Sequence, residues 1–423
     1  MGKAIRFIIA VSLLCATALT AYAQKSQILS ERIHTLQVRK NGDWQSLPVI
    51  TLGTDDRIEI TFDEFSHDYR RLIYNVRHFD ADWKESGLLE SEYMEGFNDL
   101  PIQDYANSIN TTFLYTNYFL ELPNDDVKLL VSGNYEVTIT DDENHEELLE
   151  ARFSVLENIA TVDAAVSGIT DIDNNQKHQQ LTLNIDYQRL PVNDPQGEII
   201  VRATQNRRQD VMTATLTPSY VSSGKMQFQH NRHLIFKGGN EFRRFEIINM
   251  YRYTQHVDKI DFYDPYFHAT LLTDRPMREY RYDQDHNGRY IIRYDQADNS
   301  DIEADYLLVH FSLKVPEYSG GRLYLDGDFT DGGYCDKWQM EYNRRTGCYE
   351  KSVLLKMGSY DYRYLWVPEG PAIAETSKTE GDSFETANEY QIYVWFRQHG
   401  ARYDRLVGLC DLRMTENQAL LLF

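Results

Sequence analysis

Short runs in which hydrophobic and polar residues alternate recur through most of the chain. Residues 56–62 read DRIEITF, residues 71–79 read RLIYNVRHF and residues 134–140 read NYEVTIT. A period of two, with Gly, Asn, Asp and Pro close by, is typical of half-buried antiparallel strands. Long helical periodicity is missing. The pattern therefore predicts an all-β protein built from immunoglobulin-like β-sandwich domains in series.

The alternating runs fall into blocks that polar stretches separate. The first block closes with a strand, a polar hairpin turn and a final strand, as immunoglobulin-like sandwiches end. The acidic stretch 295–306 has the composition of a linker between two patterned blocks. We expect a first sandwich at 24–157, a second β domain at 158–304, a third sandwich at 305–398 and a tail at 399–423.

The N-terminus has the three parts of a secretory signal peptide. Lys3 and Arg6 precede the apolar run 7–21, and Ala21-Tyr22-Ala23 is a small-x-small cleavage site. We expect removal of residues 1–23. The apolar run is short for a membrane anchor, and no later segment approaches the ~18 consecutive apolar residues of a membrane-spanning helix.

The charge balance and the cysteines limit the kinds of partner and of covalent framework. There are 43 basic and 65 acidic residues, a net charge of −22, so the surface repels phosphate backbones and nucleic acid is a poor partner. Three cysteines remain after cleavage, Cys335, Cys348 and Cys410. An odd, small number is no disulfide framework, and their oxidation state stays open.

No motif in the chain points to catalysis or to a cofactor. There is no G-x-S-x-G, no H-E-x-x-H and no phosphate-binding loop. Asp283, Asp285, Asn287 and Gly288 copy the first half of a calcium-binding EF-hand loop, but Tyr294 stands where the bidentate Glu belongs. The flanks also alternate like strands, so an Asp-rich turn explains the same residues.

Two segments are candidates for docking a partner. Segment 80–97 contains Trp83, Tyr93 and Phe97 and lacks clean alternation, as expected for an exposed excursion from a sandwich. Trp83 and Phe97 could equally close one end of the core. Arg243 and Arg244 follow a Gly-Gly break, which fits either a docking edge or a structural hairpin with ion pairs.

Several long strings resemble the plug protein family of the type IX secretion system of Bacteroidota. They include HFDADWKESGLLESEYMEGF (78–97), IQDYANSINTTFLYTNYFLELPNDD (102–126), FKGGNEFRRFE (236–246), DPYFHATL (264–271) and RYDRLVG (402–408). The resemblance implies a non-enzymatic, periplasmic protein of several β domains. It would occlude the outer-membrane barrel translocon when no cargo is leaving. If acidic loops meet a basic rim, that docking should be sensitive to salt.

Residues 309–366 are also similar to the early-set immunoglobulin-like domains of starch- and glycogen-binding modules. They keep the Gly327-Asp328-Phe329 turn, but eight residues separate it from Trp338, so the aromatic platform for a glucose ring is displaced. Burial in the core is the competing interpretation of Trp338. The alternative function is therefore an exported carbohydrate-binding β-sandwich protein, and a hydrolase with clustered titratable groups is a third.

Overall fold

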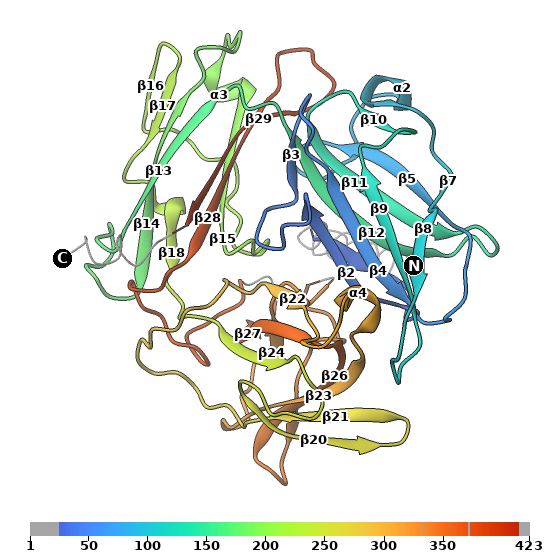
Figure 1. Ribbon diagram of the computed structural model, residues 1–423. Coiled ribbons are helices and arrows are strands. Elements are labelled where there is room, and N and C mark those ends of the chain that lie inside the picture. The colour runs from blue at the N-terminus through green and yellow to red at the C-terminus, as the bar shows by residue number, and fades with distance from the viewer. Residues whose placement is uncertain (1–24, 332, 371–372, 414–423) are drawn as a thin grey trace, which may run out of the picture.

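The computed structural model describes residues 25–331, 333–370 and 373–413, and nearly all of its regular structure is β. The strands form three structural units, each with two facing sheets (Figure 1). The expected all-β class is confirmed. The expected signal peptide lies outside the described residues, as do residues 414–423 of the expected tail.

The first unit (residues 25–157) pairs a six-stranded sheet, β1-β12-β11-β5-β7 with β3 beside β12, with the four-stranded sheet β2-β4-β9-β8. Its elements are β1 (Gln27–Ile28), β2 (Ile33–Lys40), β3 (Val49–Thr51), β4 (Ile58–Glu64), β5 (Leu72–Phe79), α2 (Glu90–Tyr93), β6 (Met94–Glu95), β7 (Leu100–Pro101), β8 (Asp104–Asn107), β9 (Thr116–Leu122), β10 (Lys128–Leu129), β11 (Gly133–Asp141) and β12 (Glu147–Leu156). The strand β9 shows the underlying pattern, because buried and half-buried residues alternate along all of it. Gly133 opens β11 at a φ of +140°, where a Cβ would lie 2.4 Å from Nε2 of His78.

The second unit combines residues 158–240 with residues 384–413. The sheet β13-β14-β17-β16, with β18 beside β14, faces the sheet β15-β28-β29. Its elements are β13 (Thr161–Ser167), β14 (His178–Asp186), α3 (Pro195–Glu198), β15 (Ile199–Gln205), β16 (Tyr220–Ser222), β17 (Lys225–Phe228), the 3₁₀ helix η1 (Arg232–Leu234), β18 (Ile235–Lys237), β28 (Glu389–Phe396) and β29 (Arg405–Arg413). Figure 1 shows this mixture directly, because green N-terminal strands stand beside red C-terminal ones.

The third unit comprises residues 241–383. The sheet β19-β27-β22, with β24 beside β27, faces the sheet β20-β21-β23-β26-β25. Its elements are β19 (Arg243–Ile247), β20 (Val257–Tyr263), β21 (Tyr266–Leu271), β22 (Tyr290–Ile292), α4 (Ser300–Glu303), β23 (Tyr306–Leu313), β24 (Gly321–Asp326), β25 (Glu341–Asn343), β26 (Cys348–Lys356) and β27 (Gly358–Pro368).

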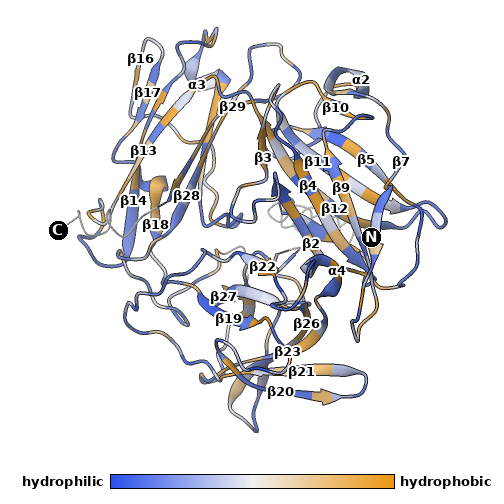
Figure 2. Ribbon diagram, viewed as in Figure 1, coloured by the Kyte–Doolittle hydropathy of each residue, from blue (hydrophilic) through white to orange (hydrophobic). Residues whose placement is uncertain are grey.

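Each unit has its own hydrophobic core, and a smaller cluster joins two of the units. Hydrophobic and hydrophilic residues are interleaved along the strands in Figure 2, so each sheet turns one face toward its partner sheet. The joining cluster includes Leu47 and Val49 of the first unit and Trp395 and Leu406 of the second. The first and second units therefore share buried apolar surface. Within the described part of the chain, no helix is long and apolar enough to cross a membrane.

Two expected domain boundaries, at 304/305 and 398/399, do not follow the sheets. Strand β28 pairs with β15 from Ile199 opposite Phe396 to Gln205 opposite Tyr390, and β29 extends the same sheet. Strand β19 pairs with β27, which joins both sides of residue 304. We therefore propose the three units above as the domains. Alternation predicts that a segment is a strand, but it does not say which distant strand it pairs with.

Candidate functional site

The three units surround a cavity of about 900 Å³. Its lining includes Trp83 of the first unit, Trp395 of the second and Phe242 of the third. Charged side chains link the units in pairs around this cavity.

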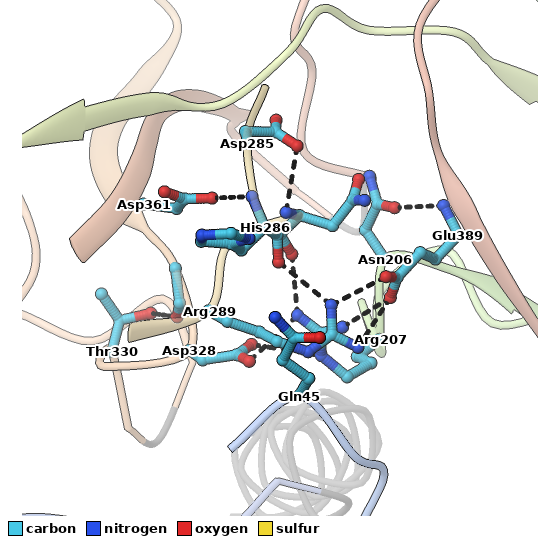
Figure 3. Close-up of polar contacts among 12 residues, drawn as sticks. Gln45, Asn206, Arg207, Asp285, His286, Arg289, Asp328, Thr330, Asp361 and Glu389 are labelled. Carbon is cyan, nitrogen blue, oxygen red and sulfur yellow. Dashed lines mark hydrogen bonds and ion pairs between the residues drawn. The ribbon is translucent and has the colours of Figure 1, made fainter. Parts of the chain in front are cut away.

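Arginines and carboxylates link the second and third units (Figure 3). Glu389 of β28 accepts two hydrogen bonds from Arg289, Nη1 to Oε1 and Nη2 to Oε2, each 2.8 Å long. Arg207 Nη1 lies 2.9 Å from Glu389 Oε2, and Arg207 Nη2 lies 2.9 Å from Asp328 Oδ2. Glu389 and Arg289 are both buried. A bidentate pair of this kind fixes the angle between the guanidinium and the carboxylate as well as their distance.

A buried lysine links the third unit to the first. Lys356 Nζ lies 2.6 Å from Asp63 Oδ2, and the hydroxyl of Tyr306 donates to the same oxygen at 2.6 Å. Asn117 Nδ2 donates to Asp63 Oδ1 at 2.8 Å. Burial raises the pKa of Asp63 and lowers that of Lys356, and the attraction between the two charges opposes both changes. The pair is thus desolvated but fully hydrogen-bonded.

Two aspartates link the first unit to the second. Asp404 Oδ2 accepts a hydrogen bond from the Ala81 amide at 2.9 Å, and Asp80 Oδ1 accepts one from the Asp404 amide at 2.9 Å. Arg397 Nη2 lies 3.0 Å from Asp80 Oδ2. Burial, followed by the charge of Asp404, raises the pKa of Asp80.

These contacts hold the three units together at the junction. Among these residues, Arg289 and Arg207 are paired with Glu389, Arg207 also with Asp328, and Lys356 with Asp63. In the described residues, no group of three or more His, Cys, Asp or Glu side chains is arranged to hold a metal ion. Sequence reasoning did not single out Asp63, Lys356, Arg289 or Glu389. The only signal was a charged residue within or beside a buried strand pattern.

The structure separates the three aromatic residues of segment 80–97. Tyr93 is buried in the first core, where its hydroxyl donates to the Val76 carbonyl at 3.1 Å. Trp83 lines the central cavity, with the Arg152 guanidinium 5.3 Å from its ring centre. Phe97 is 76 % exposed. Of the three, Phe97 alone stands on the outer surface.

Phe97 belongs to an exposed patch at the edge of the first unit, which we call the α2 patch. It consists of Leu89, Glu90, Glu95 and Phe97, on and around α2 and β6. Leu89 is 68 % exposed, so two large apolar side chains stand in solvent, and Glu90 and Glu95 are exposed in the same short segment. An aromatic anchor rimmed by polar groups is a common composition of docking surfaces.

Arg243 and Arg244 both make internal ion pairs. Arg243 lies 2.9 Å from Asp274 and 2.8 Å from Glu380, and its guanidinium lies 5.4 Å from the Tyr364 ring centre. Arg244 Nε lies 2.9 Å from Asp361 Oδ1. These pairs fit the structural interpretation of the hairpin.

Trp338 packs inside the third unit. It is 2 % exposed, its indole N–H donates to the Asp331 carbonyl at 2.8 Å, and its ring lies edge-on to Phe329 at 5.7 Å. A buried indole offers no flat face to a sugar ring. The resemblance of residues 309–366 to starch- and glycogen-binding modules stays a prediction.

The loop with the EF-hand-like spacing is a turn between β21 and β22 without flanking helices. Asp283 is exposed, whereas Asp285 points inward and accepts hydrogen bonds from the amides of Phe242 and Asn287. The carbonyl of Asn287 accepts a hydrogen bond from Arg207 Nη2 at 2.7 Å. The three candidates therefore do not converge as in an EF-hand.

Comparison with known proteins gives a family match for the first unit and similar solved structures. The family described as type 9 secretion system plug protein, 1st domain, matches residues 33–157. The crystal structure of a hypothetical protein from Parabacteroides merdae is 43% identical and has a TM-score of 0.90, with 92% of this chain and 99% of that chain covered. Dimeric latent PorU from Porphyromonas gingivalis is 9% identical with a TM-score of 0.14, with 91% of this chain and 34% of that chain covered. No curated protein matches the chain.

Proposed function

The chain belongs to the type 9 secretion system plug protein family, and from this premise we propose that it occludes the barrel translocon of that system from the periplasmic side. The protein has a role associated with type 9 secretion. In this proposal it acts without catalysis, as a body that stands in the opening while no cargo is leaving.

The observation that carries the proposal is the set of buried polar links between all three units. The pairs Asp63–Lys356 and Arg289–Glu389 each join two units through side chains that are almost completely buried. The aspartates 80 and 404 join the remaining pair of units. An occluder has to resist deformation, and units tied by satisfied buried charges cannot slide without exposing those charges.

The α2 patch is the surface we propose for contact with the barrel. Phe97 and Leu89 supply the apolar area, and Glu90 supplies negative charge, while Glu95 pairs with Lys128 at 3.1 Å. A partner with basic side chains around its opening would attract this patch and the chain's net charge of −22. Such capture weakens as salt screens the charges.

A pull-down from outer-membrane extracts tests the proposal. The mature chain, used as bait, should retain a very large outer-membrane barrel. A strain lacking the protein should become permeable to large antibiotics that the outer membrane normally excludes. If the bait retains no barrel and the strain lacking the protein is no more permeable, the proposed occluding role is wrong.

A further inference from the structure

Exposed aromatic side chains are concentrated in one stretch of the third unit. Seven aromatic side chains of the described residues are more than half exposed, and four of them lie within residues 251–263. These four are Tyr251, Tyr253, Phe262 and Tyr263. The first two precede β20 and the last two end it. Aromatic surface of this kind is typical of a contact with another protein.

The strand β20 is an edge strand whose outer side is open. It pairs with β21, and no other strand in the described part of the chain pairs with it; Figure 1 shows it at the lower margin of the third unit. Tyr263 and Tyr266 are paired across a two-residue hairpin. Because bonded and non-bonded pairs alternate from that point, the backbone N–H and C=O groups of Ile260 and Phe262 point away from β21. Such an open edge is a template for another strand.

The charges of β20 complement those of a second copy of the same strand. Lys259 and Asp261 lie 2.9 Å apart on the face turned away from the core, since Ile260 between them packs against the third core. An antiparallel pair of two β20 strands centred on Ile260 places Lys259 of each copy opposite Asp261 of the other. Four charges of alternating sign then surround the two-fold axis. Opposite charges directly across a strand pair stabilise it, whereas like charges destabilise it.

We propose that two copies of this chain associate by antiparallel pairing of β20 with β20 about a two-fold axis at Ile260. The five-stranded sheets β20-β21-β23-β26-β25 of the two copies then become one continuous sheet. The open backbone groups of Ile260 bond to those of Ile260 of the second copy. Phe262, which is 51 % exposed, lies diagonally across from that residue and gains an apolar neighbour. Two seven-residue strands bury less than the ~1,600 Å² of a stable interface, so the dimer depends on concentration.

Sedimentation velocity of the mature chain at about 1–100 µM, a range that detects weak association, tests the pairing. We expect a shift from monomer to dimer as the concentration rises. Lys259→Asp should weaken the dimer by about tenfold or more, because it places like charges opposite each other at two points. The double variant Lys259→Asp with Asp261→Lys should restore the dimer, because opposite charges face each other again. The control Lys84→Asp breaks an exposed pair with Asp82 on the first unit and should dimerise like the wild type.

A cysteine on the two-fold axis tests the register independently of the charges. Ile260→Cys, combined with Cys335→Ser to remove the exposed thiol, should form a disulfide between two copies under mild oxidation, because the residue meets its own counterpart. Tyr220→Cys, at an exposed position on β16, is the matched control in the same background and should not form one.

Three results would overturn the proposal. They are a chain that stays monomeric at every concentration, a dimer that Lys259→Asp leaves unchanged, and a dimer that Ile260→Cys does not cross-link. Phe97→Ala should dimerise like the wild type, because the α2 patch belongs to the first unit and β20 to the third. The dimer is therefore tested separately from the proposed contact with a barrel.

Discussion

Lys356 Nζ lies 2.6 Å from Asp63 Oδ2, and both side chains are buried where the third unit meets the first. The ammonium also stands 4.1 Å from the ring centre of Tyr115. The ion pair therefore holds the third unit against the first.

Lys356→Met should destabilise the protein by roughly 3–5 kcal/mol, because Asp63 would remain as an uncompensated buried charge. The double variant Lys356→Met with Asp63→Leu should recover much of that loss. Chemical denaturation followed by tryptophan fluorescence measures both. The control Lys128→Met removes an exposed ion pair with Glu95 and should cost less than about 1 kcal/mol. Equal losses for the two lysines would contradict the role of the buried pair.

Stability should fall between about pH 6.5 and pH 4 because of His78. Burial lowers its pKa from 6.5 to about 4, and its ring lies 2.8 Å from Ser86 Oγ and 3.1 Å from the Ser132 carbonyl. Below pH 6.5 His78 of the unfolded chain binds a proton, whereas His78 of the folded protein binds one only near pH 4. The free energy of unfolding therefore drops as pH falls through this window, by about 3 kcal/mol at most.

His78→Gln should flatten part of that pH dependence, while the exposed control His233→Gln should leave it unchanged. His34 has its pKa lowered to about 4 in the same way, so a residual slope is expected. Unfolding curves at half-unit pH steps measure the difference. Identical slopes for wild type and His78→Gln would rule out this histidine as a source of acid sensitivity.

Phe97→Ala should weaken binding to the barrel by about tenfold or more and leave the fold intact, since its ring is exposed and one anchoring aromatic contributes about 2 kcal/mol or more to an interface. Phe262→Ala, at an exposed position on β20 of the third unit, is the matched control. Affinity measured at low and high salt tests the acidic contribution of Glu90 and Glu95. If Phe97→Ala binds the barrel with unchanged affinity, the docking surface does not include the α2 patch.

Trp338→Ala should lose roughly 3–5 kcal/mol of stability, because it empties a large buried site in the third core. Migration of the wild-type protein in glycogen- or starch-containing gels should equal its migration in plain gels, since the indole is covered. Retardation that Trp338→Phe abolishes without loss of stability would favour the carbohydrate-binding alternative.

The three cysteines of the described residues should titrate as thiols in denaturant without reductant. Cys335, Cys348 and Cys410 are free in the structure, and Cys348 lies opposite Asn343 in the strand register. In the native protein Cys335 should react first, because it is exposed while Cys348 is buried. Fewer than three thiols in denaturant would reveal a disulfide.

The sequence predicted the class of fold and the family correctly because both depend on local patterns. The alternation in β9 follows directly from a strand with one face in a core, whereas β11, which alternates in sequence, is buried along almost all of its length. The strings that resemble the plug family include 78–97 and 102–126, and the family match covers both. The sequence could not distinguish which aromatic residues of segment 80–97 are exposed. Tyr93 and Phe97 are both large aromatic residues, yet Tyr93 is buried and Phe97 is exposed.

Alternation and composition by themselves determined that this chain folds into sheets; the extent of burial did not follow from them, because β4, β5 and β11 are buried along most of their length. Only the tertiary structure decided that β28 and β29 complete the unit begun by β15, and that Lys356 meets Asp63 across 293 residues of chain. The physical reason is that strand hydrogen bonds and buried ion pairs need a partner without specifying where along the chain it lies. That choice follows from how all the sheets pack at once.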